Sequence, residues 1–380
     1  MTATSERVSD PAEQQAPKRV SQSVFDGSRL RVVLLVDVYD GAQQQFLEAY
    51  EEMGKQVASV PGHVSDQLCQ SIENPSQWLI TSEWESAPPF LAWVNSEEHV
   101  RMVEPMHSCI RDTRSLRFHI VRETGGEAGR SASGERRLQA SPRIGDGMIR
   151  HALTFTVKPG SERKVAELLA NYKSPEARVD DTTRLCRTSL FMHGNRIVRA
   201  IEVRGDLLAA LRHVARQPEI RAVEEAINPY LEQHRDFHDQ ESVRVFFTRA
   251  ALPAVHHVTS GQDVEQAQRH ALYYPARTGM GMRLAELLAR QDERAADDPR
   301  SPVLQSTVYE RDDVVVRLID VRGGLDADPA AALGLPDAAQ VAELTTLLDE
   351  GAAKKEGDLA RLLTLARMDL ITDRRSAPDA

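Results

Sequence analysis

One stretch of this chain occurs twice, and the repeat limits the folds that the chain can adopt. Residues 150–169, RHALTFTVKPGSERKVAELL, return in altered form 119 positions later as residues 269–288, RHALYYPARTGMGMRLAELL. In the first copy, alternating apolar residues are followed by a Pro-Gly turn and then by apolar residues at helical spacing. This pattern predicts a strand, a turn and an amphipathic helix. Because the two copies share their sequence pattern, both should form this unit.

The repeat continues downstream as two matching β-rich segments. Residues 185–205 and 303–323 each contain two strand-like runs joined by a polar turn, which predicts a β-hairpin. Each unit is therefore β-α-β-β, and a further helix and strand would complete the βαββαβ order of the ferredoxin-like fold. In the first of these units, the expected helix is at 207–228 and the expected last strand at 242–248.

The N-terminal third of the chain fits the same template with weaker identity. Residues 31–38 predict an apolar strand, Tyr50 and Met53 belong to a helical stripe, and residues 67–83 predict a hairpin. We therefore predict an α+β fold of three ferredoxin-like repeats with antiparallel sheets. The expected segments are a disordered tail 1–27, unit A 28–122, a flexible linker 123–147, unit B 148–250, a connection 251–267, unit C 268–372 and a tail 373–380.

Composition excludes several classes of protein. The chain of 380 residues has a net charge of −10, and its Lys and Arg residues are scattered, which disfavours a nucleic-acid platform. No run approaches the roughly 20 apolar residues of a membrane helix, and the first residues lack a signal-peptide core. The three cysteines show no metal-type spacing, so we expect no metal site. These features predict a protein of the cytoplasm that binds neither membrane nor nucleic acid.

Several motifs resemble those of known families. Unit A, with Ser82-Glu83-Trp84-Glu85-Ser86 followed by Trp93, resembles the antibiotic biosynthesis monooxygenase family. Units B and C resemble the SchA/CurD-like domain, through the strings RHALTFTVKPGSE, INPYLEQHRDF and DVVVRLIDVRG. The resemblance implies a tailoring protein that acts on polycyclic aromatic polyketides made by type II synthases. Relatives of unit A include oxygenases that convert phenols or anthrones to quinones without flavin, haem or metal, so it implies no cofactor, with dioxygen as co-substrate.

Oxygenation without a cofactor requires an aromatic cleft, a base and donors for an oxyanion. All three tryptophans of the chain, Trp78, Trp84 and Trp93, lie in unit A and are the candidate walls of the cleft. Trp78 and Trp84 are an even number of residues apart on one expected strand, so they should share a face. Packing between sheet and helix explains the tryptophans equally well. Asn95 is a candidate oxyanion donor, although helix capping is the alternative that we favour.

The candidate bases of unit A are three histidines, because imidazole changes charge near neutral pH. His99 and His107 are eight residues apart on an expected helix and should project in roughly the same direction. His63 follows Pro61-Gly62 just before the hairpin, which places it at the rim of the cleft.

Units B and C offer fewer candidates. In unit B, Tyr230 and His234 are spaced to lie on one side of a helix, beside Arg235-Asp236, and could line a pocket. His151 is a second candidate for substrate binding, but it repeats as His270 in unit C, which favours a structural role. Unit C lacks the Pro-x5-Arg-Asp motif that units A and B share, so we expect a scaffold. His256-His257 are expected on the surface of the connection.

Units B and C share the strongest identity, and we expect them to pair within the chain in the manner of a dimeric α/β barrel. Unit A would then pair with unit A of another chain, so we predict a homodimer. The favoured function is a cofactor-independent monooxygenase that hydroxylates a polycyclic aromatic polyketide or oxidises it to a quinone. The alternatives are a polyketide cyclase or aromatase that uses the same cleft, and a non-catalytic module that binds a polyketide.

Overall fold

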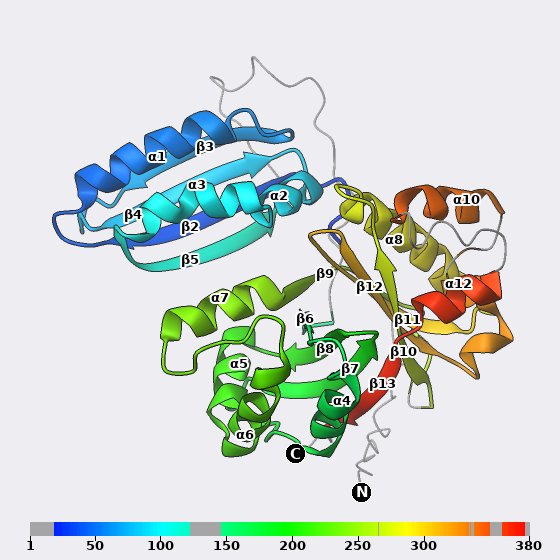
Figure 1. Cartoon of the computed structure of the whole chain (residues 1–380). Coiled ribbons are helices and arrows are strands. Elements are labelled where there is room, and N and C mark those ends of the chain that lie inside the picture. The colour runs from blue at the N-terminus through cyan, green and yellow to red at the C-terminus, as the bar shows by residue number, and fades with distance from the viewer. Residues whose placement is uncertain are drawn as a thin grey trace, which may run out of the picture.

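The computed structural model describes residues 19–121, 146–264, 266–333, 335, 338–349 and 359–376 of the chain. Residues 1–18 and 377–380 of the expected tails, and nearly all of the expected linker 123–147, lie outside these ranges. The fold is α+β, as expected, with one four-stranded and one nine-stranded sheet whose strands pair antiparallel (Figure 1). No helix of the described residues is long and apolar enough to cross a membrane.

Unit A has the ferredoxin-like order of elements. Its sheet has the strand order β3-β4-β2-β5, and its helices cover one face of that sheet (Figure 1). Alternate residues of the first strand, such as Leu30, Val32 and Val36, are buried and therefore face the helices. The elements are β2 (Leu30–Val38), α1 (Gln43–Val57), β3 (His63–Gln70), β4 (Gln77–Trp84), α2 (Ala87–Val94), α3 (Glu97–His107) and β5 (Ile110–His119).

Units B and C repeat this layout with additional helices. Unit B contains β6 (Met148–Thr156), α4 (Glu162–Asn171), β7 (Arg184–His193), β8 (Arg196–Arg204), α5 (Leu207–Arg216), α6 (Pro218–Ile227), the 3-10 turn η2 (Asn228–Tyr230), α7 (Gln240–Ala250) and β9 (Ala251–Thr259). Unit C contains β10 (Gln268–Pro275), α8 (Gly281–Asp297), β11 (Val303–Arg311), β12 (Val314–Val321), η3 (Leu325–Ala327), α9 (Pro329–Leu333), α10 (Ala338–Leu347), α12 (Leu359–Ala366) and β13 (Asp369–Arg375).

The last strand of each of these two units crosses to the sheet of the other unit. In β9, residues 251–253 pair with β6 of unit B, and residues 254–259 pair with β11 of unit C. Arg367 forms a bridge to Leu272 of β10, and β13 then pairs with β7 of unit B. The larger sheet has the order β10-β12-β11-β9-β6-β8-β7-β13 and nearly closes into a barrel, because its terminal strands meet at this bridge. This exchange is the pairing of units B and C that the repeat predicts.

The last strand of unit B was assigned to the wrong residues by the sequence pattern. Residues 242–248, expected as a strand, belong to α7, and the strand β9 lies in the expected connection. Phe246 and Ala250 are buried four residues apart on α7, which is helical spacing. His256 and His257 are only 1% and 2% exposed, so their expected surface position is also wrong.

Both expected tails contribute strands to the larger sheet. Val20–Ser23 forms β1, which pairs with β9, and Arg19 forms a 2.7 Å ion pair with Glu293 of α8. Residues 19–27 are therefore not a disordered tail, because the ladder and the ion pair fix them. At the other end, β13 continues to Arg375, beyond the boundary expected at residue 372.

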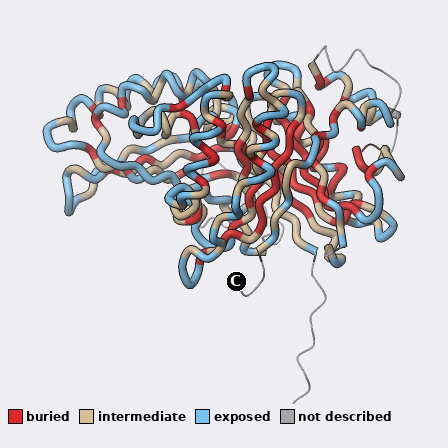
Figure 2. Tube along the Cα trace, turned by 60° about the horizontal axis from the view of Figure 1, so that its bottom comes forward, coloured by how far each residue is buried: buried red, intermediate tan, exposed pale blue. Residues whose placement is uncertain are grey.

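Buried residues gather along the strands of the larger sheet (Figure 2), and charged side chains lie among them. Arg269 of unit C forms ion pairs with Glu202 of unit B at 2.7 Å and with Asp320 at 2.8 Å. Arg187 of unit B pairs with Asp320 at 3.2 Å and with Asp373 at 2.6 Å. These pairs join the two units inside the barrel, on the same strand faces as an apolar cluster that includes Ala152 and Ala271.

Unit A packs against unit C. One hydrophobic cluster runs from Leu30, Trp84 and Leu91 of unit A to Tyr274 and Leu284 of unit C. Unit C therefore contacts both other units, one through the barrel and the other through this cluster.

Candidate functional site

Four aromatic rings of unit A lie in successive contact, and we call them the ring cluster. His63 meets Trp84 edge-on with 5.2 Å between ring centroids, and Trp84 stacks on Trp93 at 5.3 Å. His99 meets the other side of the pair, edge-on to Trp93 at 4.5 Å. Two histidines thus flank a stacked pair of tryptophans between the sheet and the helices.

Local sequence signals explain how the ring cluster forms. Trp84 ends β4 and pairs with Leu30, which places its ring on the face of the sheet that the helices cover. Ser96 caps α3, and its hydroxyl accepts a hydrogen bond of 3.1 Å from the backbone N–H of His99. Gly62 has a φ of 83°, and a Cβ at that position would lie 2.6 Å from Pro89 of α2. Glycine therefore permits the close approach that sets His63 beneath this helix.

His63 lies beside a carboxylate on its own strand. Its side chain is 6% exposed, and its Nε2 lies 3.4 Å from Oδ1 of Asp66. The other carboxylate oxygen of Asp66 accepts a hydrogen bond from the Tyr50 hydroxyl of α1. Burial and this hydrogen bond raise the pKa of Tyr50. Within the described part of the chain, Nε2 of His63 makes no hydrogen bond of good geometry.

His99 is held in its neutral form near neutral pH. Burial lowers its pKa to about 4, and the nearby charges of His107 and Arg117 act in the same direction. A neutral imidazole can accept a proton from a bound substrate. The indole N–H of Trp93 is buried and lacks a hydrogen-bond partner among the described residues, so it is a free donor beside His99.

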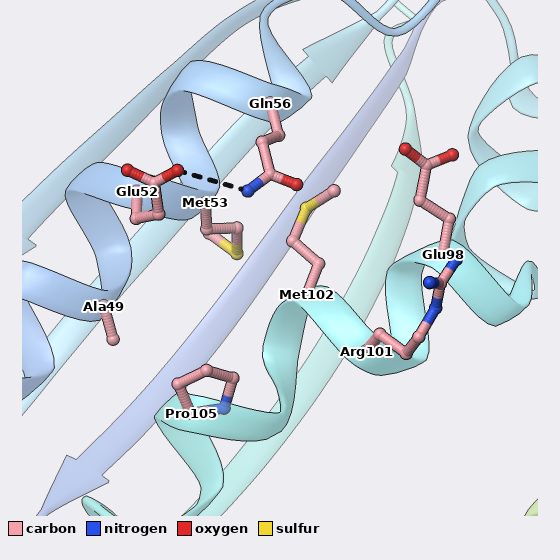
Figure 3. A pocket seen from close by; sticks show the side chains of 8 residues that line it. All are labelled: Ala49, Glu52, Met53, Gln56, Glu98, Arg101, Met102 and Pro105. Atoms are coloured by element: carbon pink, nitrogen blue, oxygen red, sulfur yellow. Dashed lines mark hydrogen bonds between the residues drawn. The ribbon is translucent and has the colours of Figure 1, made fainter.

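A groove of about 410 Å³ separates α1 from α3 (Figure 3). The side chains of Met53 and Met102 lie opposite each other in it, and both pack against the hydrophobic cluster that contains Trp84. Met102 lies one helical turn after His99, and Met53 one turn after Tyr50. The two flexible methionines therefore belong both to the lining of the groove and to the periphery of this hydrophobic cluster. The lining residues are Ala49, Glu52, Met53, Gln56, Glu98, Arg101, Met102 and Pro105.

The remaining candidates of unit A lie apart from the ring cluster. Trp78 shares a strand face with Trp84, as expected, but it contacts Phe46 at 5.5 Å in a separate core cluster. His107 is exposed at the end of α3, so His99 and His107 do not converge. Asn95 is the C-cap of α2, where its backbone N–H bonds to the carbonyl of Leu91, and Ser96 is the N-cap of α3.

The expected helical pair of unit B does not form. Tyr230 is half-buried in η2, whereas His234 is exposed in the loop that follows. The helix α6 stops at Ile227 because Pro229 cannot continue it. The buried side chain here is Arg235, which pairs with Glu224 of α6 and lies 4.3 Å from the ring centroid of Phe246.

In units B and C, ion pairs lie among the apolar residues between sheet and helices. Arg199 pairs with Glu224 at 2.7 Å in unit B, and Arg317, at the equivalent position of unit C, pairs with Asp292 at 2.5 Å. His151 of unit B is half-buried, and burial lowers its pKa to about 4. Among the described residues, no group of three or more His, Cys, Asp or Glu side chains could hold a metal ion.

Sequence patterns missed Asp66 as a partner of His63. Residues three apart on a regular strand point to opposite faces. A β-bulge between His63 and Ser65 shifts the register and brings His63 and Asp66 to one face. The sequence carries no clear signal for this bulge. Tyr50 and Met53 could have been found, because both lie on the apolar stripe of α1.

Comparisons with known proteins agree with this division of the chain. The profile of the family described as antibiotic biosynthesis monooxygenase matches residues 29–105, and that of the SchA/CurD like domain matches residues 148–260. "Polyketide synthase CurD" of Streptomyces cyaneus is 62% identical over 94% of this chain and 98% of its own length. "Protein SchA" of Streptomyces halstedii is 59% identical over 95% of this chain and 97% of its own length.

A solved structure of SnoaB, a cofactor-independent oxygenase from Streptomyces nogalater, is 15% identical, covers 26% of this chain and 96% of its own, and has a TM-score of 0.24. Fold and profiles together define a two-part protein, in which an antibiotic biosynthesis monooxygenase domain precedes a barrel of two paired repeats. The chain belongs to the SchA/CurD family.

Proposed function

We propose that this protein is a cofactor-independent monooxygenase of aromatic polyketide biosynthesis and that unit A holds its active site. The substrate would be a polycyclic phenol or anthrone, which dioxygen converts to a quinone. The observation that carries the proposal is the ring cluster, in which the ring of His99 lies 4.5 Å from that of Trp93, whose buried N–H has no hydrogen-bond partner among the described residues. The matched monooxygenase profile over residues 29–105 supports the same assignment.

The groove between α1 and α3 is the proposed entrance for the substrate. Its volume of about 410 Å³ is within the range of roughly 300–1,000 Å³ that small-molecule sites occupy. Met53 and Met102 can change rotamer at low cost, which would let a flat polycycle reach the face of the tryptophan pair. Stacking on Trp93 would then hold the substrate against the edge of His99.

The proposed reaction begins with proton transfer. Neutral His99 removes a proton from the phenol or anthrone, and the electron-rich anion that results combines with dioxygen to give a peroxide. The N–H of Trp93 donates a hydrogen bond to the developing negative charge. His99 returns its proton to the peroxide, and loss of water then leaves the new carbonyl. For an anthrone, the net change is CH₂ plus O₂ to C=O plus H₂O, which needs no further reductant.

We propose in addition that the protein is a homodimer joined through unit A. Units B and C bury the helix-free faces of their sheets against each other, whereas that face of unit A is open. Leu35 and Phe118 lie on it and are 44% and 51% exposed. Covering such a patch with the same patch of a second chain would bury both. Sedimentation should give a dimer for the natural chain and a monomer for Leu35→Arg, and a natural chain that sediments as a monomer would contradict the pairing.

Oxygen uptake tests the proposed reaction. Metal-free protein is mixed with a panel of anthrones and polycyclic phenols, with chelator present and without flavin or nicotinamide. We expect uptake by the natural chain and a loss of about 100-fold or more in His99→Gln, because a general base contributes this much. His107→Gln is the matched control on the same helix and should retain the rate.

The alternatives predict other outcomes of the same experiment. A cyclase or aromatase would release a cyclised product without consuming oxygen. A binding module would form no product, although it would quench tryptophan fluorescence, which reports only unit A because all three tryptophans lie there. Oxygen uptake at an undiminished rate in His99→Gln would mean that the active site is not in the ring cluster.

A further inference from the structure

We propose that the turn between β11 and β12 is a pH-sensitive contact, which loosens the interface between units A and C as the pH rises through neutrality. This interface is the hydrophobic cluster that joins Trp84 and Leu91 of unit A to Tyr274 and Leu284 of unit C, and we call it the A–C interface. The proposal concerns how two units of the chain hold together, so it does not depend on the proposed oxygenase reaction.

The turn is attached to the end of α8 that packs at the A–C interface. Asp312 and Asp313 form it with φ values of 50° and 64°, a left-handed conformation in which aspartate is one of the more frequent non-glycine residues. Oδ1 of Asp313 accepts a hydrogen bond of 2.8 Å from the backbone N–H of Gly281, at the start of α8. Met280 and Met282, the neighbours of Gly281, pack against the A–C interface. A change in the turn therefore affects side chains that pack at this interface.

A buried carboxyl group lies behind the turn. Glu310, near the end of β11, is 6% exposed. A Cβ on Gly281 would lie 2.6 Å from Oε1 of Glu310 and 3.0 Å from Oδ1 of Asp313, so the two carboxyl groups approach the same point of α8. Burial, together with the charges of Asp313 and Asp312, raises the pKa of Glu310 to about 7. Glu310 is therefore mostly neutral in slightly acidic solution, and it adds a negative charge to the turn when the pH rises through neutrality.

Unit A also brings a negative charge to this turn. Glu97 is the first residue of α3, and it follows Trp93, which packs against the A–C interface. Burial raises the pKa of Asp312, the charge of Glu97 acts in the same direction, and Arg311 opposes both. Like charges therefore face each other across the A–C interface, and the loss of a proton from the turn makes this contact less favourable.

One arginine offsets part of the negative charge. Nε of Arg311 lies 3.2 Å from Oδ2 of Asp312, and its Nη1 donates hydrogen bonds to the backbone carbonyls of Thr248 and, at 3.3 Å, Ala251. The first turn of α8 carries no carboxylate, and Arg283 in it is exposed. Arg311 thus contributes one positive charge, which it shares with the backbone of unit B, whereas the turn carries three carboxyl groups.

The direction of the pH dependence follows from these contacts. Separation of units A and C would take Glu97 away from Asp312 and let water reach the turn, so its carboxyl groups would lose their protons more readily. The attached state therefore binds protons more tightly than the separated state. The stability that these protons give to the A–C interface is fully present below about pH 4.5 and is lost as the pH rises through about 7.

Tryptophan fluorescence of the full chain tests the proposal, because all three tryptophans lie in unit A and Trp84 belongs to the A–C interface. We expect the emission maximum of the natural chain to move to longer wavelength between about pH 5 and about pH 8. The shift should be largely absent in Glu310→Gln and smaller in Glu97→Gln, which changes an exposed residue and leaves the core intact. Glu104→Gln changes another exposed carboxylate of α3 and should behave like the natural chain.

Hydrogen exchange gives a second readout, which the imidazoles beside the tryptophans do not affect. After correction for the intrinsic pH dependence of exchange, protection of the α2 amides should fall about 10-fold or more over this pH range, because each unit of pKa difference changes an equilibrium tenfold. Protection of α6 in unit B should stay constant, which separates opening of the A–C interface from global unfolding. A fluorescence shift that persists unchanged in Glu310→Gln and Glu97→Gln would come from His63 and His99, which contact the tryptophans, and would overturn the proposal. An equal loss of protection in α2 and α6 would overturn it as well.

Discussion

Burial disfavours the charged form of a side chain, so it lowers the pKa of an imidazole and raises the pKa of a carboxyl group. It keeps His99 uncharged, with a pKa lowered to about 4, and this neutral form is the one that the proposed reaction needs. It also raises the pKa of Glu310, on β11, to about 7, with the charges of Asp313 and Asp312 adding to the effect. Because the pKa of such a group differs between the folded and the unfolded chain, the free energy of unfolding depends on pH.

Glu310→Gln tests this linkage at a single residue. The folded chain holds the Glu310 proton more tightly than the unfolded chain, so the natural chain loses stability as pH rises from about 4.5 to about 7. The glutamine cannot ionise and should stabilise the protein at pH 8 by up to about 3 kcal/mol, at 1.36 kcal/mol for each pKa unit. Near pH 4.5 this gain should vanish. Urea unfolding at both pH values measures it, and an equal effect at the two would contradict the assigned cause.

At the scale of elements, regular patterns predicted the structure well and irregular ones did not. The strands and helices of the repeat formed as expected, because apolar residues such as Val165 and Leu169 recur at the spacing of the helix they form. The segment with Phe246 and Phe247 was mistaken for a strand, because aromatic runs favour strands until helical packing is considered. Trp84 and Trp93 could be proposed from sequence, whereas Asp66 could not, because its bulge depends on pairing between strands.

The strand β1 provides a prediction at this scale. Deletion of residues 1–23 removes the four paired positions of β1 and the ion pair of Arg19 with Glu293. We expect a loss of about 1–3 kcal/mol in the free energy of unfolding, because each cross-strand pair contributes roughly 0.2–1 kcal/mol. Deletion of residues 1–18 alone is the matched control and should change little. If both deletions have the same effect, β1 does not stabilise the sheet.

At the scale of the whole molecule, unit C joins the other two units, and its apolar interior also holds the buried ion pair of Arg317 and Asp292. The repeat also explains why unit B pairs with unit C. Arg187 of unit B faces Asp373 of unit C. At the second junction between the units, Gln305 of unit C takes the place of the arginine, and His257 of unit B takes the place of the aspartate. In a pair of two B units, Arg187 would face His257 in place of an aspartate. In a pair of two C units, Asp373 would face Gln305 in place of an arginine. Buried charges of this kind favour one pairing over the others.

The pair of Arg187 and Asp373 can be tested by a double-mutant cycle. Asp373→Ala should cost about 3–5 kcal/mol, because it leaves Arg187 partly unpaired inside the barrel. Arg187→Gln combined with Asp373→Ala should cost less than the sum of the two single changes, by roughly 1 kcal/mol or more. Denaturant unfolding of the four proteins gives the coupling energy, and strictly additive costs would argue against the pairing role.

The central claim is that unit A transfers oxygen from dioxygen to an aromatic polyketide without a cofactor. Labelling with ¹⁸O₂ tests it most directly, with metal-free protein, an anthrone substrate and mass spectrometry of the quinone. We predict that the new carbonyl carries one labelled oxygen atom, that the second appears in water, and that His99→Gln abolishes the incorporation. A product that forms without label, at the same rate in the absence of oxygen, would contradict the claim and assign the groove to cyclase chemistry.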